Sequence, residues 1–105
     1  MPSSQPPGQQ AFGDIAPKLA QLSDSVLFDD VWRRPQLAPR ERSLITVAAL
    51  VALNRLEQLP FHLQLAQRNG VSREQLAELI THLAFYAGWP AAASAVARLR
   101  ELEQE

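Results

Sequence analysis

Cysteine is absent from this chain of 105 residues. Without a thiol, the protein cannot form disulfides, cannot use a thiolate as a nucleophile and cannot bind zinc or iron through sulfur. Peroxidases and disulfide-exchange enzymes that depend on reactive thiols are therefore excluded as function classes.

An excess of one charge and long apolar segments are also lacking. The formal net charge is -1, so no basic surplus indicates nucleic acid or an anionic membrane as a partner. The longest apolar runs fall short of the roughly 20 residues that span a bilayer, and no basic segment followed by an apolar one opens the chain. We therefore expect no nucleic-acid partner, no membrane contact and a cytoplasmic location.

The residues that are present suit one all-helical (all-α) domain. Hydrophobic residues make up 47% and charged residues 20% of the chain, which is typical of a globular protein with a single core. No alternating strand pattern and no repeat of fixed period is found. We expect a disordered tail over residues 1–11, which are rich in proline and polar residues, and a helical domain over residues 12–105.

Capping and helix-breaking residues predict where the helices begin and end. We expect helices over about 14–22, within 23–36, from 38 to about 53, from 59 to 69, from 72 to 88 and from 90 onward. Ser72 and Gln75 have the spacing of a capping box. Trp32 is expected to be a core residue, because large aromatic side chains usually act by burial.

The helix expected to end near residue 53 is apolar on every face. Residues 43–53 read SLITVAALVAL, whereas a helix at the surface of a monomer has a polar back. A domain of this size has too small a core to surround such a helix. We therefore predict a homo-oligomer in which this helix packs against another subunit.

Polar side chains gather directly after this apolar run. Glu57, Gln58 and His62 lie around Pro60. Gln58 would share a helix face with His62, and Glu57 could turn inward to the same place, where a carboxylate would orient the imidazole and raise its pKa. Such a pair can donate or accept a proton near neutral pH. Alternatively, Glu57 could cap the helix that follows.

Arg42 and His82 are the other candidates. The planar guanidinium of Arg42 could hold a substrate carboxylate through two hydrogen bonds, or Arg42 could be an exposed residue paired with a nearby acid. His82 could contact substrate, with core packing or an interface hydrogen bond as the alternative. The spacing of His62, His82 and Glu57 matches no short metal-binding motif, so we expect no metal.

Residues 40–95 closely resemble the carboxymuconolactone decarboxylase family. The resemblance is carried by an R-x-R-S-L motif at 40–44, an H-x-x-x-A-x-x-x-G motif at 62–70 and a Y-x-G-x-P motif at 86–90. It implies an all-helical bundle of the alkylhydroperoxidase-D-like type, assembled into homotrimers or homohexamers.

The family divides into thiol peroxidases, with a Cys-x-x-Cys-x-x-x-His motif, and cofactor-free decarboxylases of carboxylated lactones in aromatic catabolism. With His62 on the motif histidine, the two cysteine positions hold Arg55 and Gln58, which excludes the thiol branch. The resemblance therefore implies a lyase for a small carboxylated lactone. In such a lyase, Arg42 would position the carboxylate, and His62, oriented by Glu57, would deliver the proton.

The sequence departs from the decarboxylase pattern at one position. That pattern is similar to Glu-Leu-x-x-His, which would place an acid at position 58, where this chain has Gln58 beside Glu57. A shift of one residue turns a helical side chain by about 100°. Two functions remain open: a cofactor-free acid/base lyase, and a noncatalytic binding or structural homo-oligomer of the same fold.

Overall fold

The computed structural model describes residues 5–102, and all regular elements within them are helices. The predicted all-helical fold class is confirmed. The chain divides into two compact units, Met1–Gln36 and Leu37–Glu105. One domain over residues 12–105 therefore stays a prediction, because the helices before and after residue 36 group separately. Within residues 5–102, no helix combines the length and the apolar character needed to cross a bilayer.

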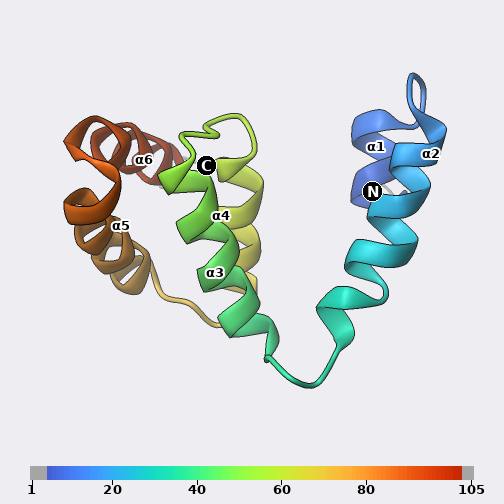
Figure 1. The fold of residues 1–105 in the computed structure, drawn as a ribbon, viewed down its shortest axis with the longest axis horizontal. Coiled ribbons are helices and arrows are strands. Elements are labelled where there is room, and N and C mark those ends of the chain that lie inside the picture. The colour runs from blue at the N-terminus through green and yellow to red at the C-terminus, as the bar shows by residue number, and fades with distance from the viewer. Residues whose placement is uncertain (1–4, 103–105) are drawn as a thin grey trace. The chain divides into compact units, whose positions relative to one another are not determined.

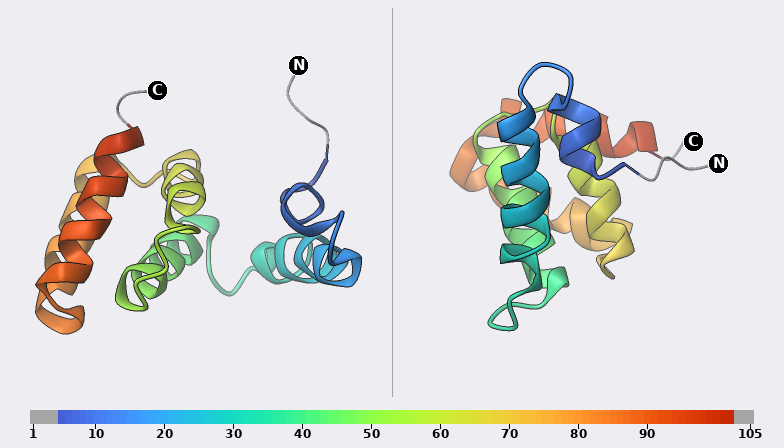
Figure 2. Two further views of the ribbon diagram at one scale, coloured as in Figure 1. Left: turned by 90° about the horizontal axis from the view of Figure 1, so that it is seen from above. Right: turned by 90° about the vertical axis from the view of Figure 1, so that its right-hand side faces the viewer.

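An aspartate from a later turn completes the first helix of the first unit. The carboxylate of Asp24 accepts hydrogen bonds from the backbone N–H groups of Gly8 at 2.7 Å and Gln9 at 2.9 Å. N–H groups in the first turn of a helix have no partner within the helix, so Asp24 supplies the missing acceptors. Figure 2 shows the resulting arrangement, in which α1 (Pro7–Phe12) packs beside α2 (Pro17–Gln21) and the π-helix η1 (Leu22–Phe28).

The helix α1 contradicts the predicted disorder for residues 7–11 only. Residues 7–11 belong to α1, while residues 1–4 lie outside the described part of the chain. The acceptor for Gly8 lies 16 residues further along the chain, so the local composition contains no signal for this helix. The next helix begins at Pro17 rather than at the predicted Asp14, with the proline in its first turn.

Trp32 takes part in the packing of the first unit. It lies in the short 3-10 helix η2 (Val31–Arg33) and is half-buried. The centroid of its ring is 5.8 Å from that of Phe28. Because Trp32 is only half-buried and is not among the buried core residues, its predicted core position is not confirmed.

The second unit is a bundle of helices with a continuous apolar core. Its helices within residues 37–102 are α3 (Pro39–Ala52), α4 (Leu59–Arg68), α5 (Arg73–Ala87) and α6 (Trp89–Leu102). Figure 1 shows α3 beside α4 and α5 beside α6. Since α3 and α6 each contact both α4 and α5, the latter two helices occupy opposite corners of the bundle. The core consists of Val47, Val51, Leu59, Leu63, Ala66, Val71, Leu76, Ile80, Ala84, Ala92, Ala95 and Leu99.

Residues in the left-handed conformation end both α3 and α4. Asn54 has a φ of 57° and Gly70 a φ of 96°. The N–H group of the next residue then reaches back to a carbonyl of the last turn, at 2.8 Å after Asn54 and 2.9 Å after Gly70. These are the bonds of a Schellman motif, which favours glycine or asparagine at this position. The predicted ends of the two helices are confirmed.

The predicted capping box starts α5. The hydroxyl of Ser72 accepts a hydrogen bond from the N–H of Gln75, and the side-chain oxygen of Gln75 accepts one from the N–H of Ser72, both at 3.0 Å. The two residues thus satisfy two N–H groups that the helix itself leaves without partners. The side-chain amide of Gln75 is held at the start of α5 as a result.

Within the second unit, α3 buries only one of its apolar faces. Ser43, Val47 and Val51 are buried, whereas Ile45 is 55% exposed and Leu53 is 64% exposed. The other helices of the second unit therefore do not surround α3. The oligomer that would cover the exposed face remains a prediction.

Replacing Ser72 by alanine should lower the free energy of unfolding by about 1 kcal/mol, because one N–H of α5 loses its acceptor. Urea denaturation measures the difference. Ser72→Asp is the matched control, since aspartate retains an acceptor at the same position and should keep most of the stability. Equal stability of the wild type and Ser72→Ala would show that the capping box contributes nothing.

Candidate functional site

His62 is placed by the start of α4. Pro60 occupies the first turn of this helix, where its missing N–H has no cost. The N–H of His62 donates to the carbonyl of Gln58 at 3.4 Å. The imidazole is half-buried with its Nδ1 atom fully buried, and it meets the ring of Phe61 edge-on with 5.0 Å between centroids. The backbone bond thus places His62 in α4, and the ring of Phe61 packs against its imidazole.

Burial lowers the pKa of His62 below its ordinary value of 6.5. The cause is desolvation, which disfavours the charged imidazolium. The sequence predicts the opposite direction, through a carboxylate beside the ring, and that prediction is wrong. The His62 side chain is therefore mainly neutral at pH 7.

Glu57 lines a notch whose lining does not include His62. The Glu57 side chain is exposed, and the notch, of about 460 Å³, lies between the loop after α3 and the helix α6. The lining consists of Leu56, Glu57, Pro60, Arg98, Glu101 and Leu102. Gln58 is exposed, and its side chain makes no capping hydrogen bond to α4. The loop therefore does not present Glu57 to the imidazole, which explains why no carboxylate raises the pKa.

Arg98 holds this loop against α6. Its Nε atom donates to the carbonyl of Leu56 at 3.3 Å, and its guanidinium also pairs with Glu101 at 3.2 Å. The residue before Glu57 is thus anchored from a position 42 residues away in the chain. Nothing in the sequence around Glu57 indicates this anchor, and sequence analysis missed it.

Arg42 lies in the first turn of α3, near the far end of α4. Its side chain is half-buried with a buried Nε atom. The neighbouring residue Ser43 is fully buried, and its hydroxyl accepts a hydrogen bond from the side-chain amide of Asn69 at 3.0 Å. Because His62 precedes Asn69 by seven residues, Arg42 and His62 are offset by about 10 Å along α4. An extended arginine and a small substrate can together span that distance.

The Ser43–Asn69 hydrogen bond is a second feature that sequence analysis missed. Ser43 is the buried polar residue of α3, and burial of a hydroxyl is costly without a partner. The bond joins the start of α3 to the end of α4 and so sets the register between Arg42 and His62. The available signal was a serine at the start of an otherwise largely apolar run.

His82 belongs to another corner of the bundle. It is exposed on α5, and its ring lies 5.0 Å from that of Tyr86. It lines a groove between α3 and α5 that also includes Arg40. Since α4 and α5 occupy opposite corners, the structure does not bring His82 to His62. Among residues 5–102, no three acidic or histidine side chains are grouped closely enough to hold a metal ion.

Comparison with known proteins shows which family the chain matches. Residues 17–101 match the family described as the carboxymuconolactone decarboxylase family. The match begins in α2 and ends in α6, so it covers all five candidate residues, which are Arg42, Glu57, Gln58, His62 and His82.

Two curated relatives carry the names of decarboxylases. A 4-carboxymuconolactone decarboxylase from Acinetobacter baylyi is 44% identical over 73 residues, which cover 70% of this chain and 54% of that protein. A nitrosuccinic acid decarboxylase from Metarhizium robertsii is 33% identical over 66 residues, which cover 63% of this chain and 46% of that protein. The chain thus spans about half the length of the curated relatives it matches.

The lowered pKa of His62 makes folding sensitive to acid. The unfolded state binds more protons than the folded state between the folded pKa and the ordinary value of 6.5. The free energy of unfolding should therefore fall as the pH decreases below about 6.5, and the loss should level off below the folded pKa. His62→Gln should remove this part of the pH dependence in urea denaturation.

An NMR titration of the imidazole protons tests the same point directly. The chain has two histidines, so His82→Gln leaves the signals of His62 alone. The midpoint should lie below 6.5, and a midpoint at or above that value would contradict the burial effect.

Proposed function

Because this chain belongs to the carboxymuconolactone decarboxylase family, we propose that it is a cofactor-free lyase that removes CO₂ from a small carboxylated lactone. The names of the two relatives, each a decarboxylase of an organic acid, support the reaction class. The observation that carries the proposal is the half-buried imidazole of His62, which burial keeps neutral in the free protein.

The proposed chemistry requires one proton. Cleavage of the bond to the carboxylate leaves an electron pair on the substrate as an enolate-type anion, and a general acid must protonate that anion. A bound carboxylate near His62 favours the imidazolium form and raises its pKa. His62 would therefore take up a proton from solvent as the substrate binds and donate it to the substrate after CO₂ leaves, which returns the imidazole to its neutral form.

Arg42 is the proposed anchor for a substrate carboxylate. Its guanidinium can donate two parallel hydrogen bonds, and its position near the end of α4 would orient the reacting carbon toward His62. Glu57 faces the notch beside α6, so the proposal does not use it as the direct partner of His62. Gln58 is exposed near His62 and is a further candidate donor to the lactone carbonyl.

Replacement of His62 by alanine should lower the turnover of γ-carboxymuconolactone by ~10²-fold or more, because the proton donor is lost. Release of CO₂ and consumption of the lactone measure the rate, and circular dichroism checks the fold. Glu57→Gln is the comparison variant and should change turnover by less than about tenfold, since a general acid contributes such large factors only when it reaches the substrate. Wild-type turnover in His62→Ala would end the proposal.

A noncatalytic binding protein is the second candidate. Gln58 favours it, because an amide occupies the position where the family's decarboxylase pattern has an acid. Such a protein would show a raised melting temperature with the lactone, because a ligand that binds the folded state stabilises it, but would show no turnover. The turnover assay therefore separates the two candidates, because only the lyase releases CO₂ from the lactone.

A homotrimer or homohexamer is part of the proposal. Ile45 on α3, Leu53 directly after α3 and Phe61 beside His62 are exposed apolar side chains. A second subunit placed over them would remove apolar area from water and close the region around His62 to solvent. Charged residues would be unfavourable at the centre of such an interface.

Light scattering at micromolar concentration should therefore give a mass of three or six chains. Ile45→Lys should yield smaller species, because it places a charge in the proposed interface. Ala97→Lys changes an exposed residue of α6 and is the matched control, which should leave the mass unchanged. A monomeric wild type would contradict the proposed assembly.

A further inference from the structure

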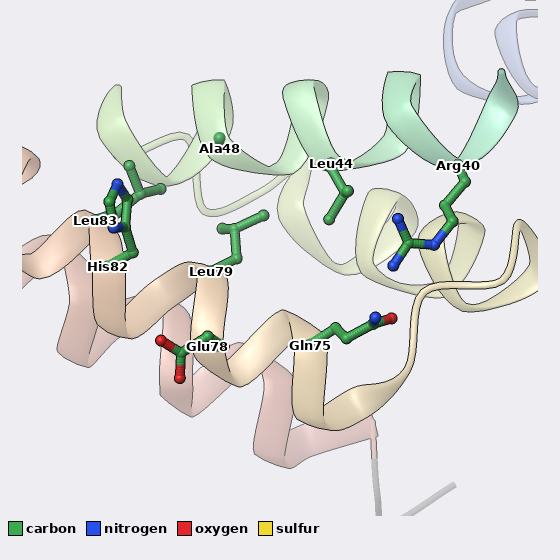
Figure 3. A pocket seen from close by; sticks show the side chains of 8 residues that line it. All are labelled: Arg40, Leu44, Ala48, Gln75, Glu78, Leu79, His82 and Leu83. Carbon is green, nitrogen blue, oxygen red and sulfur yellow. The ribbon is translucent and has the colours of Figure 1, made fainter. Parts of the chain in front are cut away.

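A second groove lies between α3 and α5, and the proposed reaction does not use it. Its volume is about 370 Å³. Figure 3 shows its lining, in which the α3 residues face the α5 residues across the groove. The lining residues are Arg40, Leu44 and Ala48 from α3, with Gln75, Glu78, Leu79, His82 and Leu83 from α5.

Two hydrogen-bond donors meet at one end of this groove. Figure 3 shows the guanidinium of Arg40 and the amide of Gln75 at the same end. The side-chain oxygen of Gln75 is occupied by the N–H of Ser72 at 3.0 Å, so its NH₂ group is left to donate. The ion pair of Arg40 with Glu41 is long, at 3.9 Å, which leaves most guanidinium donors available for a ligand.

The middle of the groove is apolar. Leu44, Ala48, Leu79 and Leu83 form its floor and are only partly buried, so they still present apolar surface. The distance from Arg40 to Ala48 along α3 is about 12 Å. The exposed ring of His82 lies at the end away from Arg40, as Figure 3 shows. The floor therefore fits an elongated apolar body rather than a compact polar one.

We propose that this groove binds an amphipathic monocarboxylate, with the carboxylate at Arg40 and Gln75 and the apolar body along the floor. A guanidinium and an amide NH₂ match the two oxygens of a carboxylate. The carboxylate of Glu78 on the α5 side disfavours a second negative charge along the ligand. The ligand is thus a monocarboxylate with an apolar body, such as a medium-chain fatty acid or an arylalkanoate, and a dicarboxylate should bind more weakly.

This site is independent of the proposed lyase. His62 lies on α4, at the corner of the bundle opposite α5. Ligand binding in the α3–α5 groove would therefore persist if His62 proved to have no catalytic role. Equally, failure of the groove to bind a carboxylate would leave the proposed reaction untouched.

The probe for the experiment is decanoate, with 1-decanol as its uncharged counterpart. Isothermal titration calorimetry of the full chain should show saturable binding of one decanoate per chain. Decanol should bind at least about tenfold more weakly, because it loses the charge-assisted hydrogen bonds at Arg40 and Gln75. Equal binding of the two probes would overturn the proposal, and so would binding of decanoate without saturation.

Gln75→Glu is the decisive variant. Glutamate at this position preserves the S-x-x-E capping box with Ser72, but it replaces the NH₂ donor with a carboxylate that repels the ligand. Arg40→Gln removes the guanidinium from the same end. Each variant should weaken decanoate binding by about tenfold or more, with an unchanged unfolding midpoint for Gln75→Glu.

Arg100→Gln is the matched control, because Arg100 is an exposed arginine of α6 that does not line the groove. It should bind decanoate as the wild type does. Wild-type affinity in both Gln75→Glu and Arg40→Gln would place the ligand elsewhere and overturn the proposal. A second copy of the chain could occupy the groove instead of a carboxylate. In that case Arg40→Gln would have a smaller mass by light scattering and the wild type would not bind decanoate. This result would also overturn the proposal.

Discussion

Burial of one face of α3 is the constraint on which the second unit depends. Val47 and Val51 are almost completely excluded from solvent, and α3 contacts all three other helices of this unit. Full burial of an aliphatic side chain stabilises a fold by about 1.5–3 kcal/mol, so these contacts determine how the four helices are arranged. The remaining apolar faces of α3 cannot be buried by the same neighbours. One of them forms a wall of the α3–α5 groove, and another leaves Ile45 exposed.

The ends of α3 and α4 then determine what surrounds His62. The Schellman motif at Asn54 turns the chain out of α3, and the hydrogen bond from Arg98 to Leu56 holds the following loop on the α6 side. Glu57 consequently faces the notch beside α6, although it is only five residues from His62. At the other end of the helix pair, the bond between Asn69 and Ser43 sets the position of Arg42 relative to α4. The candidate site therefore combines the half-buried imidazole of His62 on α4 with Arg42 at the start of α3, while Glu57 lines the notch beside α6.

The packing of the helices also explains why the two histidines of the chain have different surroundings. His62 lies on a helix packed closely against α3, and burial lowers its pKa. His82 projects from α5 at the opposite corner, exposed beside Tyr86 and the α3–α5 groove. From the sequence, His82 could contact the same substrate as His62, with core packing or an interface hydrogen bond as the alternative. The bundle separates them because α4 and α5 are not neighbouring corners.

The sequence by itself determined the features that depend on neighbouring residues. These features are the ends of α3 and α4, the capping box at Ser72 and the all-helical class. They depend on hydrogen bonds within one or two helical turns, and short sequence motifs predict such bonds. The absence of cysteine likewise excluded thiol chemistry without any structure. Only the tertiary structure decided that Asp24 completes α1, that Glu57 lines the notch beside α6 and that the pKa of His62 falls rather than rises. Each of these depends on burial or on a partner far away in the chain, and neither is encoded in local spacing.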